Sequence, residues 1–347
     1  MDPTVWRILD ANSNRAREAL RVMEDHARFA LDDATLTELA KSLRHALAEA
    51  LAPLAKARAV VMRDTPGDVG TQLAGSGEYQ RGTSLDVVRA AGKRATEALR
   101  VLEEYGKTVD VPMAAAVEAI RYRAYDLEKR IVHVADARAR FADVRLYVLI
   151  TQALCRHPWQ EVMRRSAAGG ANCFQLREPD LPDRELLARA EEFRKLCREL
   201  DALCIINDRA DIAAAVDADG VHVGQHDLPV AAARRIVGPQ RLIGVSTHNR
   251  AEADAAIAAA PDYIAVGPMF ATNVKPEYGV AGTEYLRAVR QTTSLPIVAI
   301  GGINADNVAE VAAAGATCVA VATAISAADD VEATARSIHS RSNTTEG

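Results

Sequence analysis

The sequence lacks several features that would place it in a common class of protein. No apolar run approaches the roughly 20 residues that a helix needs to span a bilayer. The first residues have neither the basic start nor the apolar core of a signal peptide. No basic cluster stands out in a chain of net charge -5, so nucleic acid is not an expected partner. We therefore expect a cytoplasmic protein that does not bind a membrane. Whether the protein forms a homo-oligomer stays open.

Cysteine pairs and catalytic triads are also missing. The five cysteines form no Cys-x-x-Cys pair, so a thiolate metal site is not expected, and buried thiols suit a reducing compartment. No Walker-type loop and no Ser-His-Asp or Cys-His arrangement can be made out. A protein nucleophile is therefore not expected.

The first 140 residues show apolar residues at helical spacing and no clear strand signal. Within them residues 15–25 recur, with few changes, as residues 94–104. A match of this length indicates duplicated helical units, related by a pseudo-two-fold axis. Each copy carries a polar stripe, which is either solvated helix surface with ion pairs or one wall of a shared cleft. The stripes are Asn14, Glu18, Arg21 and Asp25 in one copy and Lys93, Glu97, Arg100 and Glu104 in the other.

A loop rich in glycine, aspartate and threonine separates the two copies, at residues 63–71 and 75–84. Such a loop can bind phosphate or a metal ion, and the same composition is found in plain connectors. Both interpretations stay open.

From about residue 141, short apolar runs alternate with helical segments. Eight such units in about 205 residues predict an α/β fold, a compact (β/α)8 TIM barrel over 141–347, after an all-α domain over 1–140. A doubly wound open sheet is the alternative, although it more often has five or six strands. The expected strands are residues 146–150, 173–176, 203–206, 220–223, 242–245, 263–266, 297–300 and 318–321. The expected helices include residues 183–200, 231–237, 251–259, 284–292 and 307–314.

Two glycines follow the seventh expected strand, in Gly301-Gly302-Ile303-Asn304. Glycines let the backbone approach a ligand closely, and N–H groups at the start of the following helix can hold a phosphate. The loops after strands seven and eight are the usual phosphate site of TIM barrels. We therefore expect a phosphate here, with a plain Gly-Gly turn as the alternative.

Charged side chains follow several expected strands, at the end where TIM barrels place their active sites. Asp208 and Asp227 follow neighbouring strands. A pair of carboxylates near cations suits a Mg²⁺ ion that keeps water ligands and binds substrate phosphates. The cations expected to face the same negative charge are Arg177, Arg209 and Lys275.

Three histidines lie near these positions. His222 falls inside an expected strand and is interpreted as a hydrogen-bonded barrel residue rather than a ligand. His226 and His248 lie in loops, and no role is assigned to them.

From about residue 143 onward, the strand-end motifs resemble those of thiamine-phosphate synthases in order and spacing. They are Gln175-Leu176-Arg177-Glu178, Ile206-Asn207-Asp208-Arg209, residues 219–227, Gly244-Val245-Ser246-Thr247-His248 and Gly267-Pro268-Met269-Phe270. The resemblance implies an enzyme that joins 4-amino-2-methyl-5-(diphosphomethyl)pyrimidine to a thiazole phosphate, plain or carboxylated, giving thiamine phosphate and diphosphate. In that family diphosphate leaves first, and the thiazole nitrogen attacks the resulting pyrimidine-methyl cation.

The same resemblance implies which residues bind these small molecules. The pyrimidine diphosphate is expected at Gln175, Leu176, Arg177, Glu178, Pro179, Asn207, Ser246 and Lys275. The thiazole phosphate is expected at Thr272, Asn273, Val274, Gly302, Ala322 and Thr323. Mg²⁺ is expected at Asp208 and Asp227.

The sequence departs from the family pattern at three positions. Pro179 stands where the family usually has lysine, Val274 stands where it has a threonine, and Thr323 replaces the serine after strand eight. These departures bear on substrate affinity more than on the type of reaction.

The repeated helical region resembles a small domain that is sometimes fused to thiamine-phosphate synthases. The resemblance rests on Asn-x-x-Arg-Ala-x-Glu-Ala-Leu-Arg-Val-x-Glu and on the Arg-Asp-Thr-x-x-Asp-Val-Gly of the intervening loop. It implies phosphorylation of hydroxymethylpyrimidine phosphate, and a docking or oligomerisation module is the alternative. For the barrel, the alternatives are a non-catalytic phosphate-binding barrel or another enzyme such as an indole-glycerol-phosphate synthase. The Lys acid and Glu base of that enzyme are not apparent.

Overall fold

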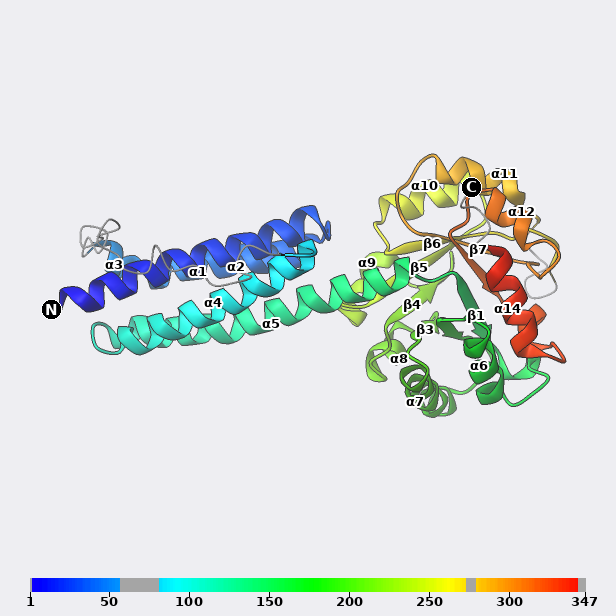
Figure 1. Cartoon of the computed structure of the whole chain (residues 1–347), viewed down its shortest axis with the longest axis horizontal. Coiled ribbons are helices and arrows are strands. Elements are labelled where there is room, and N and C mark those ends of the chain that lie inside the picture. The colour runs from blue at the N-terminus through cyan, green and yellow to red at the C-terminus, as the bar shows by residue number, and fades with distance from the viewer. Residues whose placement is uncertain (1, 57–80, 273–278, 343–347) are drawn as a thin grey trace. The chain divides into compact units, whose positions relative to one another are not determined.

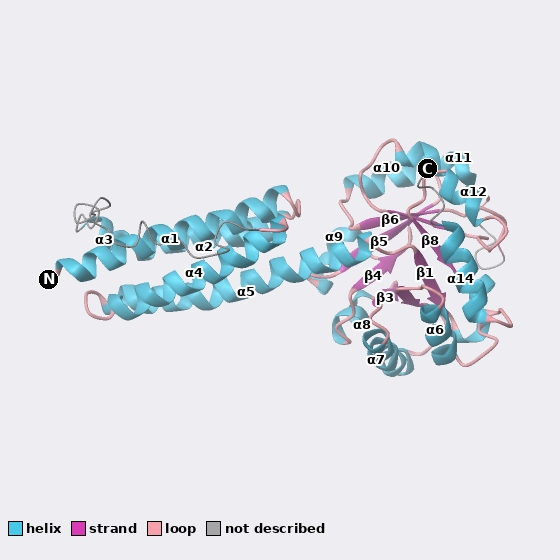
Figure 2. Cartoon of the chain, viewed as in Figure 1, coloured by secondary structure: helices cyan, strands magenta, loops and turns pink. Residues whose placement is uncertain are grey.

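The protein divides into two compact units, Met1–Asp136 and Ala137–Gly347. The structure is a computed structural model, and it describes residues 2–56, 81–272 and 279–342 (Figure 1). The first unit is helical and the second alternates strands with helices (Figure 2). The expected boundary at residue 140 falls inside helix α5 (Val111–Ala142), whose last turns belong to the second unit.

The first unit consists of amphipathic helices that bury one apolar stripe each. They are α1 (Pro3–Phe29), α2 (Ala34–Ala50), the short α3 (Ala52–Lys56), α4 (Ser84–Gly106) and most of α5. Helix α1 packs against α2 and α4, and its Leu20 and Met23 are fully buried. Thr83 and Asp86 form a capping box that starts α4. Most of the expected polar loop, residues 63–80, lies outside the described residues.

The polar stripes of the repeat lie on solvated helix surface. Arg21 pairs with Asp25 across one turn, and Arg100 pairs with Glu104 in the same way. All four side chains are more than 40% exposed. The surface interpretation of the stripes is therefore the one that the structure supports.

The duplicated unit also contains buried ion pairs, whose glutamates occupy equivalent positions in the two copies. Glu24 on α1 pairs with Arg44 on α2, and Glu103 on α4 pairs with Arg121 on α5 at 2.9 Å. Burial raises the pKa of Glu103, but the hydrogen bond and charge of Arg121 outweigh it and hold that pKa below its usual value. The same pair in both halves confirms the predicted duplication.

Replacing Arg121 with alanine is expected to lower the free energy of unfolding of the helical unit by about 1.5–3 kcal/mol, because Glu103 loses its buried partner and keeps Arg100 and Lys107, whose side chains are about half exposed. The matched variant Arg44→Ala should cost less, since the Arg44 side chain is 26% exposed against 7% for Arg121. Trp6 lies in this unit and the only other tryptophan, Trp159, lies in the barrel. Urea unfolding followed by fluorescence in a Trp159→Phe background therefore reports this unit, and equal losses for the two variants would contradict the account.

The second unit is a closed barrel of parallel strands, in the order β1 to β8. This excludes the open-sheet alternative. The predicted strand ranges match the structure except at β3 and β5, which extend to Asn207 and Thr247. The strands are β1 (Leu146–Ile150), β2 (Cys173–Leu176), β3 (Leu203–Asn207), β4 (Gly220–Val223), β5 (Leu242–Thr247), β6 (Tyr263–Val266), β7 (Ile297–Ile300) and β8 (Cys318–Val321).

Helices follow the strands and cover the outside of the barrel (Figure 2). They are the 3-10 turn η2 (Gln152–Leu154), α6 (Trp159–Ala168), α7 (Asp183–Glu199), α8 (Ala210–Ala215), α9 (Val230–Val237), α10 (Arg250–Ala258), α11 (Gly282–Arg290), α12 (Val308–Ala313), α13 (Thr323–Ser326) and α14 (Val331–Ser342). In the part of the chain that the structure describes, no helix is both long and apolar enough to cross a membrane.

Alternation along each strand divides the barrel side chains between two cores. Val148 and Ile150 pack outward against the helices, whereas Tyr147 and Leu149 point into the barrel. The same alternation places polar side chains of other strands inside the barrel, where they meet one another instead of water.

The last turns of α5 contact the base of the barrel. Phe141 stacks on Tyr263 with ring centroids 4.2 Å apart. Asp262 is buried and accepts hydrogen bonds from Arg138 at 2.8 Å and from Arg234 at 2.5 Å. Residues from 137 onward are therefore part of the barrel unit.

Candidate active site

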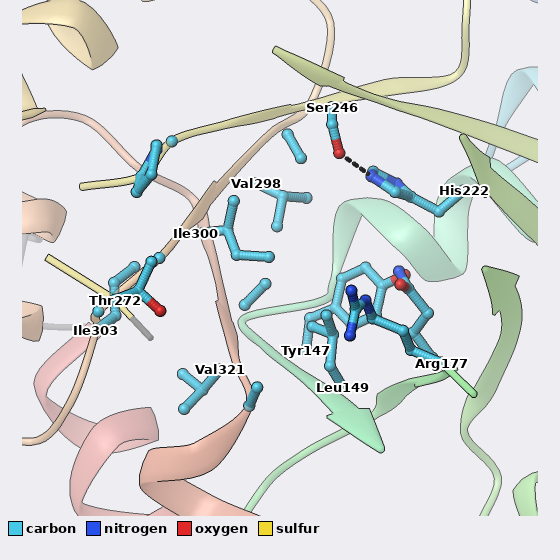
Figure 3. A pocket seen from close by; sticks show the side chains of 18 of the residues that line it. Tyr147, Leu149, Arg177, His222, Ser246, Thr272, Val298, Ile300, Ile303 and Val321 are labelled. Carbon is cyan, nitrogen blue, oxygen red and sulfur yellow. Dashed lines mark hydrogen bonds between the residues drawn. The ribbon is translucent and has the colours of Figure 1, made fainter. Parts of the chain in front are cut away.

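A cavity of about 340 Å³ opens among the C-terminal ends of the strands. Apolar side chains such as Leu149, Val298, Ile300 and Val321 form part of its wall (Figure 3). The structure gathers most of the predicted substrate residues around it. Those that line the cavity are Gln175, Arg177, Asn207, Ser246, Thr272, Gly302, Ala322 and Thr323.

Other predicted substrate residues do not line this cavity. Leu176 is the next residue after Gln175 in β2, so it faces the opposite side and packs in the outer core. Glu178 accepts hydrogen bonds from the backbone of Gln152 and from Arg189. Gln175 and Arg177 are therefore better candidates for contact with a ligand than Leu176, Glu178 and the adjacent Pro179. Asn273, Val274 and Lys275 lie outside the described residues.

The two predicted metal ligands follow β3 and β4, which are paired in the barrel. Asp208 adopts a φ of 61° and accepts a hydrogen bond from the Asn207 amide at 2.5 Å. Asp227 accepts one from the backbone of Gly224 at 2.7 Å. Among the described residues, no group of three or more His, Cys, Asp or Glu side chains gathers that could hold a metal ion. Two carboxylates suit a Mg²⁺ ion that takes its other ligands from substrate phosphates and water.

The expected role of Arg209 in facing substrate charge is wrong. Its guanidinium pairs with Asp183 at 2.5 Å and with Asp211 at 2.6 Å, and Arg209 does not line the cavity. These hydrogen bonds raise its pKa above its usual value. In the described part of the cavity wall, Arg177 is the cationic side chain (Figure 3).

The loop after β7 has the strand–turn–helix order that its sequence predicts. Helix α12 begins at Val308, one residue after the expected start at 307. The backbone N–H groups of residues 304, 306 and 307 are bound by the side chains of Asn304 and Asn307. These N–H groups are therefore already paired within the loop. Gly301 and Gly302, with φ of 96° and 70°, line the cavity together with Ala322 and Thr323 after β8, and their backbone is the better candidate.

Sequence reasoning missed a polar network in the cavity wall, in which Tyr147, Gln175, His222 and Ser246 line the cavity and Tyr263 is fully buried. His222 Nδ1 lies 3.1 Å from the Tyr263 hydroxyl. His222 Nε2 lies 2.9 Å from Ser246 Oγ (Figure 3). The Tyr263 hydroxyl lies 3.2 Å from that of Tyr147, which accepts a 2.7 Å hydrogen bond from Gln175. Burial raises the pKa of both tyrosines, so both are protonated at neutral pH. The prediction that His222 is a hydrogen-bonded barrel residue is confirmed.

Comparison with known proteins assigns both units. Residues 146–325 match the family model for thiamine monophosphate synthase. The thiamine-phosphate synthase of Synechocystis sp. is 44% identical over 92% of this chain and 91% of its own. The chain belongs to the thiamine-phosphate synthase family. It is accordingly an enzyme, a transferase of thiamine biosynthesis, and the resemblance of the strand-end motifs is confirmed.

Further relatives cover both units or the barrel alone. The thiamine-phosphate synthase of Rhodopirellula baltica is 42% identical over 96% of this chain and 91% of its own. A solved thiamine phosphate pyrophosphorylase from Pyrococcus furiosus is 36% identical to this chain, with a TM-score of 0.56. The match covers 60% of this chain and 100% of the Pyrococcus chain. A synthase barrel thus exists without the helical unit. Residues 7–130 of that unit match the ThiD2 family.

Replacing Gly302 with alanine is expected to raise the KM for the thiazole phosphate by about tenfold or more. A Cβ there would lie 2.6 Å from the carbonyl oxygen of Ala271, so the loop at the cavity must shift. The matched control is Gly315→Ala, whose φ of 97° is also positive but whose Cβ would meet its nearest atom, on Arg290, only at 3.8 Å. Both variants should lose about 1–2 kcal/mol of stability through backbone strain, and only Gly302→Ala should change the KM. Steady-state kinetics with calorimetric melting checks this, and an equal rise in KM for both would refute it.

Proposed function

We propose that the barrel joins hydroxymethylpyrimidine diphosphate to thiazole phosphate, giving thiamine phosphate and diphosphate. The observation that carries the proposal is that predicted substrate residues from six strand ends line one cavity, in a chain that belongs to this family. The C–O bond between the methylene carbon and the diphosphate breaks, and its electrons leave with the diphosphate. The thiazole nitrogen then forms the new bond to that carbon.

The residues around the cavity suit a reaction that builds charge on a leaving group. Arg177 presents a guanidinium, which can donate hydrogen bonds to diphosphate oxygens. Asp208 and Asp227 would hold a Mg²⁺ ion at the rim, and such an ion supplies further neutralisation of the diphosphate charge. Asn207 connects the cavity to an expected metal ligand, because it lines the cavity and its side chain donates a hydrogen bond to Asp208.

The thiazole nitrogen has to be held in place, and it does not need a base to activate it. The backbone around Gly302 and Ala322, with the Thr323 hydroxyl, would hold the thiazole phosphate. The apolar wall around Val298 and Ile300 keeps water from the cation that forms before attack. Holding two reactants together in this way accounts for a large part of the rate enhancement of such reactions.

The proposal is tested by incubating the purified chain with both substrates and measuring thiamine phosphate by chromatography. Product should form with Mg²⁺, cease when EDTA is added and return when Mg²⁺ is restored in excess. A full rate in EDTA would reject the metal proposal, and no product with any divalent metal would reject the synthase proposal.

We further propose that the helical unit transfers the terminal phosphoryl group of ATP to hydroxymethylpyrimidine phosphate, giving the diphosphate that the barrel consumes. Support comes from the match of residues 7–130 to the ThiD2 family together with the sequence resemblance described above. A docking or oligomerisation module is the competing assignment, and the deletion experiment in the Discussion separates the two.

We also propose that the protein works in the cytoplasm. All five cysteines are free, and Cys173, Cys197, Cys204 and Cys318 are buried. Unpaired buried thiols in an enzyme of this size suit a reducing compartment.

A further inference from the structure

Helix α5 carries a second stripe of side chains on the face that points away from the core of the helical unit. Its core-facing stripe includes Ile120 and Ala124, which are buried. Tyr122 lies two residues from each of them, about 200° around the helix axis, so its ring faces outward. Tyr122 is 60% exposed, Tyr125 is 47% exposed and Val111 is 63% exposed. The α5 outer stripe consists of Val111, Ala115, Glu118, Tyr122, Tyr125, Lys129 and Val132.

The spacing of the α5 outer stripe is that of a coiled-coil seam. Its successive members are separated by four, three, four, three, four and three residues. This is the alternation of the a and d positions in a heptad repeat, which keeps one seam of a helix against a partner helix over several turns. The stripe therefore has the geometry for side-by-side packing against a second helix, over about 30 Å of helix length.

The packing that is common to both halves of the helical unit does not require this stripe. Arg44 on α2 and Arg121 on α5 occupy equivalent positions, because they pair with the equivalent glutamates of the repeat. The next residue is the exposed His45 on α2 and the exposed Tyr122 on α5. Helix α2 contains no Phe, Tyr or Trp. The aromatic face is therefore confined to one half of the duplicated unit.

Arg121 holds both tyrosines of the stripe in place within a single chain. Its guanidinium carbon lies 4.6 Å from the ring centroid of Tyr122 and 6.0 Å from that of Tyr125, which is within the range of a cation–π interaction. The Arg121 side chain is fixed in turn by Glu103 and is only 7% exposed. Ordering side chains opposes association, so rings that are already ordered lower the free-energy cost of forming an interface.

The charges of the α5 outer stripe complement those of the same stripe running in the opposite direction. Glu118 lies four residues before Tyr122, and Lys129 lies four residues after Tyr125. An antiparallel copy therefore places Tyr122 against Tyr125 and Glu118 against Lys129, and each contact occurs twice. A parallel copy in register would place Glu118 against Glu118 and Lys129 against Lys129, and like charges at these positions oppose pairing.

We propose that the α5 outer stripe binds the same stripe of a second copy of this chain, antiparallel, about a two-fold axis between Tyr122 and Tyr125. The tyrosines of the two copies form the aromatic centre of the interface. Glu118 of each copy pairs with Lys129 of the other. The inference needs neither of the activities proposed above, so its failure would leave both of them untouched.

The first test measures the dimer dissociation constant of the full chain by analytical ultracentrifugation over a series of concentrations. The wild-type chain should be a dimer that dissociates on dilution. Glu118→Lys replaces two ion pairs with two like-charge contacts and should raise the dissociation constant by about tenfold. Glu118→Lys combined with Lys129→Glu exchanges the charges and should restore the wild-type value. The matched control is Glu49→Lys, the same change at an exposed position on α2, which should leave the constant unchanged.

The second test removes the aromatic centre of the interface. The double variant Tyr122→Ala, Tyr125→Ala should raise the dissociation constant by about a hundredfold, because buried aromatic side chains at the centre of an interface contribute most to its affinity. Both side chains are exposed in a single chain, so the helix content measured by circular dichroism should not change. The matched control is Tyr105→Ala, which removes an exposed tyrosine of α4 outside the stripe and should leave the constant unchanged.

A wild-type chain that stays monomeric at the highest concentration, or a dimer that Glu118→Lys does not weaken, would overturn the proposal. Failure of the charge exchange to restore the dimer would reject the antiparallel pairing. An equal rise in the dissociation constant for Glu49→Lys would show that net charge, and not the α5 outer stripe, governs association.

Discussion

Replacing Asp208 with asparagine is expected to lower kcat at limiting Mg²⁺ by about a hundredfold to a thousandfold. The change removes one of two carboxylates that would hold the ion beside the diphosphate. Asparagine is preferred to alanine here because Asp208 has a φ of 61°, which asparagine tolerates and alanine does not without strain. An asparagine oxygen can still accept the hydrogen bond from Asn207, so the loop should keep its shape.

The rate is measured across a Mg²⁺ titration, with circular dichroism to verify the fold. Asp227→Asn should behave like Asp208→Asn, since the second ligand follows the neighbouring strand. Asp211→Asn is the matched control: it removes a nearby carboxylate that pairs with Arg209 and that is not an expected metal ligand. Near-normal turnover of Asp208→Asn at limiting Mg²⁺ would show that this residue is not a metal ligand.

Removing the helical unit is expected to abolish synthesis from the pyrimidine monophosphate and to spare synthesis from the diphosphate. Given ATP, hydroxymethylpyrimidine phosphate and thiazole phosphate, the full chain should yield thiamine phosphate, and residues 137–347 should yield none. The fragment begins at residue 137 because Arg138 and Phe141 contact Asp262 and Tyr263. A start at residue 141 would leave the buried Asp262 carboxylate without one of its two arginines. The Pyrococcus chain indicates that a barrel of this kind folds alone.

The control for this comparison is the rate from the diphosphate, which should be the same for both chains. If neither chain uses the monophosphate while both use the diphosphate, the kinase proposal is rejected and the docking alternative gains support. Light scattering of both chains would then show whether residues 1–136 set the oligomeric state.

The barrel was predictable from the sequence because its strands are short apolar runs that end in glycine or polar residues. Leu146–Ile150 and Ile297–Ile300 are examples whose limits agree with the structure. Strand β5 extends further than predicted because Ser246 and Thr247 are polar yet remain in register with β6. The expected helix 307–314 agrees with α12 to within one residue at each end, and Asn304 and Asn307 bind backbone N–H groups in the loop before it.

The site was predictable where the chemistry lies at strand ends and hidden where it depends on contacts across the barrel. Gln175 and Arg177 both line the cavity, as their spacing along β2 indicates. Arg209 looked equivalent in sequence, but its neighbours Asp183 and Asp211 hold it elsewhere. Tyr147 and Tyr263 belong to strands far apart in the chain, and no local pattern marks two tyrosines as hydrogen-bond partners.

The most direct test of the central claim is to quantify thiamine phosphate and diphosphate in the same reaction of the full chain with both substrates and Mg²⁺. The account predicts that the two products appear together in a one-to-one ratio, and that neither accumulates in Arg177→Ala at a comparable rate. Diphosphate released without thiamine phosphate, or neither product from the folded wild-type chain, would contradict it.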